Sequence, residues 1–385
     1  MKVVDLIFIG FLGVFWLFFF WNWFKKGKGW EIGLLMAVFH FSMTYLSYRY
    51  ILQSGGDSLT YWRVAAFPKV SQGDWVFVLP YSAEYFLWMI RPFARFLGLS
   101  FFSGTLLFSS LSLLAFSWIL KFLIRNKSVF QSSNAFFSVL PFIVLFLPNT
   151  HFWTSLVGKE SFLFFLTVLS MKLVLDRKFL FLPVILLLAI LIRPVFGILI
   201  LAVVGFLLVK KGGRNKAQKV GIALGSVILT IIAGNFLILY FDDFTFNFQL
   251  AETYAQYQYA RFNSSGAITS VPMEDYNWIY RLFTVAFRPF IFESIEAGWM
   301  IFLKIENTIL FLICLGIPIS VYRYPRLFPF VVLILFYFFS IAISANVFGV
   351  FVRLKSVVTP FFALMGIWGW ILLSSKIQEF SRSDS

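Results

Sequence analysis

Residues 179–209 read FLFLPVILLLAILIRPVFGILILAVVGFLLV, and this stretch decides the fold class because Arg193 is its only charged residue. A helix that crosses the hydrocarbon core of a membrane needs about 20 apolar residues. Arg193-Pro194 divides the stretch into two pieces, 179–192 and 195–209, that are both shorter than this. They fit either two tilted short helices or a broken, re-entrant pair, which is tolerated at membrane depth where protein surrounds it.

The rest of the chain has the same apolar character. Of its 385 residues 60% are hydrophobic and 13% are charged, which is about half the charged share of a typical globular domain. A water-soluble fold cannot cover so much apolar surface. We therefore predict an all-α polytopic membrane protein forming one membrane domain over residues 1–385. The eleven predicted spans lie near 5–24, 30–51, 99–120, 133–150, 160–175, 179–192, 195–209, 220–241, 297–321, 327–344 and 357–375.

The positive charge is distributed as expected for a membrane protein. A net charge of +15 also suits nucleic-acid binding, but the basic residues are spread over short loops between apolar segments. The loops after alternate spans carry them, at 25–28, 121–127, 177–178, 210–219 and 323–326. By the positive-inside rule these loops are cytoplasmic. The rule predicts an outer N-terminus, a cytoplasmic C-terminus and no nucleic-acid partner.

Two predicted outer segments are long. Residues 52–98 include a stretch, 81–97, whose aromatic and charged residues suit an amphipathic helix at the membrane surface. Residues 242–296 are polar and rich in tyrosine, and they are expected to form a small external cap. The single cysteine, Cys314, excludes a disulfide framework and a cysteine-based metal site.

Charged residues at the predicted outer ends of spans are the candidates for chemistry, because ionisable groups at membrane depth are usually functional. Asp57 follows a turn at Gly55-Gly56 and suits a general base or a metal ligand, or simply a turn with interfacial aromatic residues. Pro148 is expected to end the fourth span, and Lys159 and Glu160 to begin the fifth. Lys159 suits anion binding and Glu160 acid–base catalysis, unless they only satisfy the helix end.

Three more basic residues lie on the predicted outer side. An arginine between two apolar pieces, as Arg193 is, is unfavourable unless it meets an anion or a carboxylate. Arg353 and Lys355 violate the positive-inside rule, so they are expected to join Lys159 and Arg193 in a pocket for a phosphate group. Weaker candidates for sugar contacts are Tyr61, Trp62, His151 and Trp153, although interfacial aromatic belts explain such residues equally well.

The pattern resembles the EpsG-like and Wzy-like polysaccharide polymerases and the broader GT-C class of membrane glycosyltransferases. The resemblance rests on about eleven spans, a Gly-x-Asp-x-x-x-Tyr element from Gly55 to Tyr61, a central Arg193 and a late Arg353. In addition, residues 152–161, FWTSLVGKES, are similar to a segment of bacterial exopolysaccharide-cluster proteins.

The resemblance implies glycosyl transfer from a polyprenyl-diphosphate donor on the outer face of a bacterial cytoplasmic membrane, in exopolysaccharide, capsule or O-antigen synthesis. Lys159, Arg193 and Arg353, with Lys355, would bind the diphosphate, and Asp57 or Glu160 would accept the proton. The implied partners are the lipid-linked sugar, membrane lipids and other polysaccharide-assembly proteins. The sequence requires no cofactor, and a divalent metal, if used, would bind these carboxylates.

The sequence leaves two alternatives to a polysaccharide polymerase open. A repeat-unit polymerase and a transferase that adds one sugar are not separated. A flippase or transporter of lipid-linked sugars or of a small anion predicts ionisable residues deep within spans and internally repeated half-helices. The charges here gather at the outer ends and no repeat is visible, which favours chemistry at the outer face.

Overall fold

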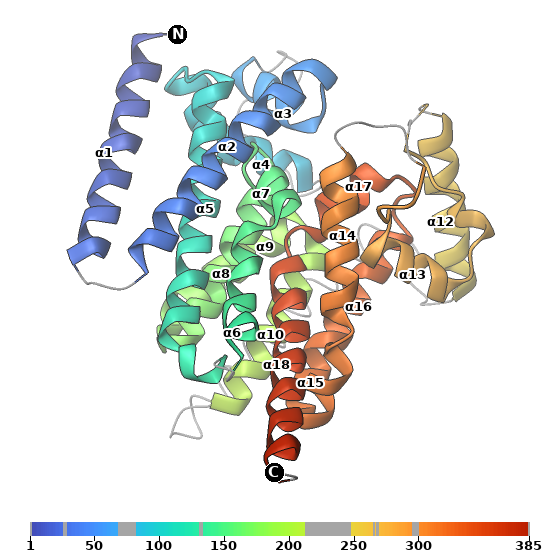
Figure 1. The fold of residues 1–385 in the computed structure, drawn as a ribbon. Coiled ribbons are helices and arrows are strands. Elements are labelled where there is room, and N and C mark those ends of the chain that lie inside the picture. Colours follow the sequence, from blue (N-terminus) through green and yellow to red (C-terminus); the bar gives the residue numbers. More distant parts are fainter. Residues whose placement is uncertain are drawn as a thin grey trace. The chain divides into compact units, whose positions relative to one another are not determined.

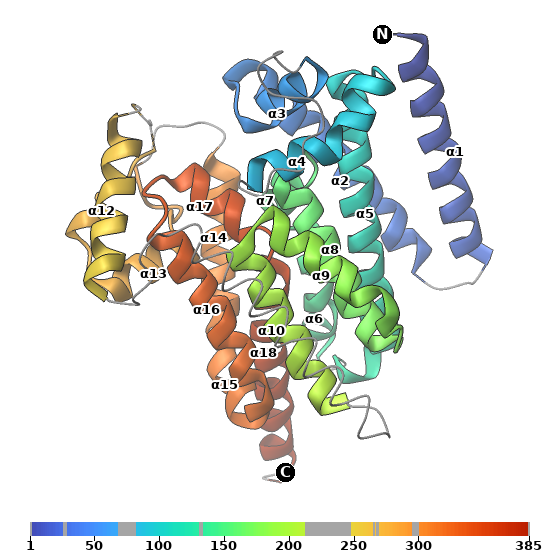
Figure 2. The ribbon, with the colours of Figure 1, turned by 180° about the vertical axis from the view of Figure 1, so that it is seen from behind.

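Helices account for the regular structure of the chain (Figures 1 and 2). The computed structural model describes residues 2–25, 29–67, 82–130, 134–211, 248–264, 266, 269–294 and 300–383. Over these ranges there is no β-strand, and the pairing of Ser270 with Val347 is an isolated bridge. The prediction of an all-α protein is confirmed for this part of the chain.

Five helical segments are long and apolar enough to cross a membrane, namely Val3–Lys25, Phe101–Arg125, Ala135–Thr154, Ile301–Arg323 and Pro325–Ala342. A sixth would be the pair Phe348–Lys355 and Thr359–Ser375, which is bent by 73°. These segments support a membrane protein. They do not confirm eleven spans. The helix at 30–51 is not among the five, and the predicted span at 220–241 lies outside the described residues. Shorter helices form at three further predicted spans, 160–175, 179–192 and 195–209.

The chain divides into two compact units. The first unit comprises the described residues of Met1–Trp118 and Phe152–Phe244. Its elements are α1 (Val3–Lys25), α2 (Trp30–Ser54), α3 (Asp57–Ala66), α4 (Ser82–Arg91), the π-helical turn η1 (Pro92–Phe96), most of α5 (Phe101–Arg125), α8 (Lys159–Leu175), η4 (Phe179–Phe181), α9 (Leu182–Ile192) and α10 (Pro194–Lys211).

Several predicted outer segments meet at one end of the first unit. At the start of α1, Lys2 Nζ donates to the carbonyl of Gly98 at 3.1 Å, and Asp5 accepts from the Ser100 amide at 2.8 Å. From α3, Trp62 Nε1 donates to the Leu99 carbonyl at 3.3 Å. The contacts bring the start of α1, the helix after α2 and the residues before α5 together, as the predicted alternation of spans requires.

The predicted surface helix at 81–97 is present as α4 and η1. Phe86, Ile90 and Ala94 are buried at four-residue spacing, whereas Glu84 and Trp88 are exposed. The buried side chains form a core with Trp62 and other residues of α3 and α5. A helix with one apolar stripe buries that stripe against its neighbours, so α4 is part of the first unit.

Helices α9 and α10 form a hairpin of short helices, which is compatible with both alternatives for residues 179–209. They pack closely around the turn at Arg193, because a Cβ on Gly197 would lie 2.5 Å from the backbone of Ile190. At 1.5 Å per residue the 11 residues of α9 measure about 16 Å, about half the thickness of a hydrocarbon core. These are two short packed helices, and α9 is shorter than the candidate spans.

The second unit comprises the described residues of Ile119–His151 and Thr245–Ser385. Its elements are η2 (Lys127–Val129), α6 (Ala135–Val139), the 3-10 helix η3 (Leu140–Phe146), most of α7 (Pro148–Thr154), α12 (Phe248–Ser264), η5 (Met273–Asp275), α13 (Trp278–Phe287), α14 (Met300–Cys314), α15 (Ile317–Arg323), η6 (Pro325–Leu327), α16 (Phe328–Ala342), α17 (Phe348–Lys355) and α18 (Thr359–Ser383). The predicted cap at 242–296 contains α12, η5 and α13.

Glycines allow the closest packing in the second unit. Helices α15 and α18 lie side by side in both views (Figures 1 and 2). A Cβ on Gly369 would lie 1.8 Å from the carbonyl oxygen of Gly316, so these two backbones touch. Small residues at such contacts are typical of helix association in membranes.

The prediction that Pro148 ends the fourth span is wrong. Pro148 begins α7, and the candidate span runs on to Thr154. Proline is accepted at the first position of a helix, where its missing N–H has no helical partner to lose. The helix consequently contains His151, which is buried within the protein.

Candidate functional site

Glu160 and Arg193 form an ion pair in the first unit. Arg193 Nη2 donates to Glu160 Oε1 at 3.0 Å. The Glu160 side chain is 7% exposed and the Arg193 side chain is 21% exposed. The carboxylate is therefore covered, and the Arg193 side chain is partly exposed although its Nη1 atom is buried. Together with Lys159 and Tyr61 we call this group the Glu160 cluster.

Local sequence explains how the two side chains are positioned. Arg193 precedes a proline, which disfavours helical backbone, and it is extended with φ −151° and ψ 94°. It therefore ends α9 and occupies the turn into α10. Glu160 lies in the first turn of α8, where the helix dipole stabilises a negative charge. Gly158 leaves room for it, since a Cβ there would lie 3.3 Å from Glu160 Oε2.

Lys159 connects this pair to α3. Its side chain is buried, and its Nζ lies 5.9 Å from the centre of the Tyr61 ring, within the range of a cation–π interaction. Tyr61 follows Asp57 by four residues, so both lie on one face of α3. Asp57 is exposed at the start of this helix, after Gly55 and Gly56 with φ of 75° and 124°. The predicted turn is confirmed.

A further arginine in this unit has an unsatisfied donor. The Nε of Arg91 is buried and has no hydrogen-bond partner. Arg91 ends α4, and α4 packs against α9, the helix that Arg193 ends. Buried polar groups without a partner are rare and require an explanation. An anion bound at this end of the unit would supply one.

The predicted sugar-contacting tryptophans lie in the core. Trp62 is 4% exposed and packs over Gly104, and Trp153 is 8% exposed with its ring against Tyr50 and Phe152. Trp153 Nε1 has no hydrogen-bond partner. Their ring faces are occupied by protein, so of the aromatic candidates in this unit only Tyr61 remains half-exposed. The two tryptophan rings that were predicted to contact a sugar pack in the protein core instead.

Lys355 belongs to the second unit and is bound internally. Its Nζ is buried and donates to the Ala286 carbonyl at 2.8 Å and to Asn307 Oδ1 at 2.9 Å. Glu306, also buried, accepts from the Asn149 amide at 2.7 Å. A buried ammonium group is stable only with such partners. We therefore leave Lys355 out of the proposed phosphate site, contrary to the sequence prediction.

Arg353 and His151 are the other predicted residues of the second unit. Arg353 lies half-buried on α17, the short helix bent away from α18. Its combination with Lys159 and Arg193 in one pocket stays a prediction. His151 is fully buried, and its Nε2 lies 2.9 Å from the Leu145 carbonyl oxygen. This contact gives His151 a structural explanation.

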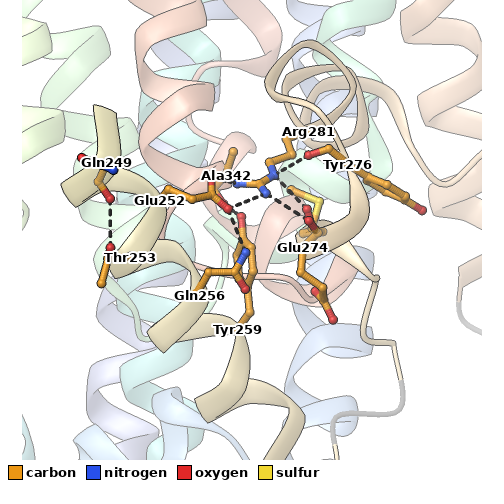
Figure 3. Close-up of polar contacts among 10 residues, drawn as sticks. Gln249, Glu252, Thr253, Gln256, Tyr259, Glu274, Tyr276, Arg281 and Ala342 are labelled. Atoms are coloured by element: carbon orange, nitrogen blue, oxygen red, sulfur yellow. Dashed lines mark hydrogen bonds and ion pairs between the residues drawn. The ribbon is translucent and has the colours of Figure 1, made fainter. Parts of the chain in front are cut away.

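Sequence reasoning missed a second arginine–glutamate pair, which lies between α12 and α13. Arg281 donates from Nη1 and Nη2 to the two carboxylate oxygens of Glu252, at 2.7 and 2.9 Å, and Figure 3 shows the two side chains pointing toward each other. Its Nε donates to the carbonyls of Met273 and Tyr276 at 2.8 and 2.9 Å. Together with the rings of Trp278 and Tyr259, these residues form the Arg281 cluster.

Aromatic rings complete the Arg281 cluster. The guanidinium lies 4.4 Å from the centre of the Trp278 ring and 5.6 Å from that of Tyr259. Hydrogen bonds from Arg281 hold the pKa of Glu252 below its ordinary value. Burial raises the pKa of Tyr259 to about 12, and its hydroxyl donates to the Ala342 carbonyl (Figure 3). Nearly every polar group of the cluster is engaged, which indicates a structural role in the cap.

In the described ranges no group of three or more His, Cys, Asp or Glu side chains is arranged to hold a metal ion. Comparison with known proteins gives no assignment, since no family model, curated protein or solved structure matches the chain. The function must accordingly be argued from the clusters themselves.

Proposed function

We propose that the protein transfers a glycosyl group from a polyprenyl-diphosphate-linked donor at the outer face of a bacterial cytoplasmic membrane, during synthesis of a surface polysaccharide. The observation that carries the proposal is the Glu160 cluster. It combines a covered carboxylate with a partly exposed arginine side chain and a buried lysine. It also shares one end of the first unit with the segments that are predicted to lie outside.

The charges of the cluster suit an anionic leaving group. Glu160 neutralises one of the two cations Lys159 and Arg193, which leaves one positive charge in excess. An arginine presents several N–H groups in a planar fork that matches phosphate oxygens. Arg193 is held by Glu160 and by the turn before Pro194, so it is oriented before a ligand arrives. Such preorganised donors are most effective where negative charge develops in the transition state.

In the proposed reaction an acceptor sugar hydroxyl attacks the anomeric carbon of the donor. The bond from that carbon to the diphosphate oxygen breaks, and its electron pair leaves with the lipid diphosphate. Arg193 and Lys159 stabilise the departing charge, and a carboxylate accepts the hydroxyl proton. Glu160 lies beside the cations, and Asp57 lies one turn from Tyr61 at the start of α3. Both are candidates for the base.

The first experiment is complementation of a deletion strain with Arg193→Ala, Arg193→Lys, Glu160→Gln and Asp57→Ala, with membrane levels of each variant measured. Arg63→Ala is the matched control, because Arg63 is an exposed arginine on α3 in the same unit. We expect short or single repeat units with Arg193→Ala and full-length polysaccharide with Arg63→Ala. A deletion strain with unchanged polysaccharide would exclude the proposal.

The second unit favours one alternative, transport of a lipid-linked sugar. Helices α17 and α18 form an apolar pair bent by 73°, and the buried Lys355 lies at the bend, in the same unit as the buried Glu306. Broken helices with ionisable residues are typical of transporters. The leaflet in which lipid-linked repeat units accumulate in the deletion strain separates the two functions. Outer-leaflet accumulation supports glycosyl transfer, and inner-leaflet accumulation supports transport.

A further inference from the structure

Helix α1 touches the rest of the first unit at only a few points. Over its 23 residues the buried side chains are Asp5, Trp16 and Trp23. Trp16 Nε1 donates to Ser110 Oγ at 3.0 Å, and the Trp23 ring packs so closely on α2 that a Cβ on Gly33 would lie 2.9 Å from it. Beside these contacts, α1 and α2 leave space between them.

That space is an apolar cavity of about 700 Å³ between α1 and α2. Phe20 of α1 lines it, and Leu34, Val38, Phe41 and Tyr45 line it from α2. Its walls face outward, since Leu34 is 47% exposed and Val38 is 59% exposed. Because α1 is a candidate span, these walls lie at the depth of the hydrocarbon core. The space is then open to lipid chains.

A positive charge lies one helical turn beyond the lining residue Tyr45. Leu34, Val38, Tyr45 and Arg49 recur at helical spacing and therefore share one face of α2. Arg49 is exposed, and its Nη1 donates to Tyr45 Oη at 3.3 Å. From Leu34 to Arg49 the helix rises about 22 Å. An apolar groove of this length with a cation at its end matches the tail and the headgroup of an anionic lipid.

We propose that the cavity between α1 and α2 binds an acyl chain of an anionic phospholipid, whose phosphate is held by Arg49. Water is a poor occupant, because the polar groups of the lining are few and the Ser42 hydroxyl already donates to the Val38 carbonyl. A hydrocarbon chain fills an apolar space in a bilayer without leaving a polar group unpaired.

The occupant is a bilayer phospholipid rather than a polyprenyl diphosphate. One guanidinium balances the single negative charge of a phosphodiester, whereas a diphosphate calls for more than one cation. The exposed walls are also accessible to the bulk lipid, which is in great excess over any lipid-linked sugar. The bound lipid joins α1 to the unit where direct contacts are sparse. This inference does not depend on the proposed glycosyl transfer.

The test is native mass spectrometry of the full-length protein in detergent micelles that contain phosphatidylglycerol or, separately, phosphatidylcholine. The wild type is expected to retain one phosphatidylglycerol. Arg49→Ala is expected to retain about tenfold less, the effect of losing one charge-assisted hydrogen bond. Val38→Trp fills the cavity with a bulkier side chain at an exposed position, and it should expel the lipid although Arg49 is present. Arg63→Ala, an exposed arginine in the same unit, should retain it.

Three results would overturn the proposal. Equal retention of phosphatidylcholine, or unchanged retention of phosphatidylglycerol in Arg49→Ala, would show that the site does not select an anionic lipid through Arg49. Retention in Val38→Trp would show that the lipid lies elsewhere. Preferential retention of added polyprenyl phosphate over phosphatidylglycerol would assign the cavity to a different occupant. None of these measurements depends on polysaccharide synthesis. A negative result for lipid binding therefore does not affect the proposed glycosyl transfer, and a negative result for glycosyl transfer does not affect the proposed lipid site.

Discussion

Two of the three arginine–glutamate pairs in the described residues, Glu160–Arg193 and Glu252–Arg281, use the same residue types with opposite exposure, whereas both partners of the third, Arg288–Glu293, are equally exposed. In the pair of the first unit the carboxylate of Glu160 is covered at 7% and the Arg193 side chain is 21% exposed. In the pair of the second unit Arg281 is covered at 3% and Glu252 is 36% exposed. In the first pair the arginine is the more exposed partner, whereas the second encloses its cation between carbonyls and rings. The exposure of the arginine, more than the ion pair itself, distinguishes a candidate anion site from an ion pair that only stabilises the fold.

The largest effect should come from removing the exposed cation. Arg193→Ala is expected to lower glycosyl transfer about 100-fold, the usual effect of removing one donor that stabilises developing charge. It should also lower the free energy of unfolding by about 2 kcal/mol, because the covered Glu160 carboxylate loses this partner. Polymer yield in membranes and thermal unfolding in detergent measure the two quantities. A large loss of stability with normal activity would make Arg193 structural.

Removing the enclosed cation, Arg281, should lower the stability of the protein and have little direct effect on glycosyl transfer. Arg281→Ala removes one donor from the carbonyls of Met273 and Tyr276 and two from the carboxylate of Glu252. We expect the free energy of unfolding to fall by about 3 kcal/mol. Limited proteolysis between α12 and α13, compared with the Arg261→Ala variant of an exposed arginine on α12, localises the loss. An intact cap in Arg281→Ala would contradict this assignment.

Local sequence signals predicted much of the first pair and none of the second. Arg193-Pro194 interrupts an apolar stretch, and Lys159-Glu160 follow a glycine at the start of another. Both features mark helix ends, and the structure confirms them. The ion pair between them spans 33 residues, and it was allowed for only as an unnamed carboxylate. Glu252 and Arg281 stand 29 residues apart in a polar segment, where nothing local indicates a partner.

Burial explains the remaining differences between prediction and structure. Trp62, Trp153 and Lys355 were assigned to a ligand because their residue types suit one, but packing and internal hydrogen bonds engage them. Composition cannot tell an interfacial tryptophan from a buried one, since both occur at span ends. In the same way a basic residue in a predicted outer loop has internal acceptors, such as the Ala286 carbonyl, that no sequence pattern reveals.

The position of the exposed cation depends on the hairpin that carries it. Gly197→Ala should force α9 and α10 apart, because the new Cβ would lie 2.5 Å from the Ile190 backbone. Overpacking of this kind lowers the free energy of unfolding by about 2 kcal/mol. Gly349→Ala is the matched control, since no atom lies within 4 Å of its Cβ position. Equal stabilities of the two variants would show that the hairpin yields without strain.

The smallest effect concerns the protonation of the exposed carboxylate, Glu252. Its pKa in the folded protein lies below the ordinary value of 4.5 because Arg281 donates to it. Above pH 4.5 the carboxylate is ionised in both states, so the pair contributes its full stabilisation. As the pH falls below 4.5, the unfolded state binds the proton first and the contribution is lost. With the carboxylate partly exposed, the change should stay below about 1 kcal/mol.

The unfolding temperature of the wild type should therefore fall more between pH 6 and pH 3.5 than that of Glu252→Gln. The control is Glu84→Gln, at an exposed glutamate of α4, which should follow the wild type. Parallel curves for wild type and Glu252→Gln would mean that Arg281 is held by its carbonyls and rings alone.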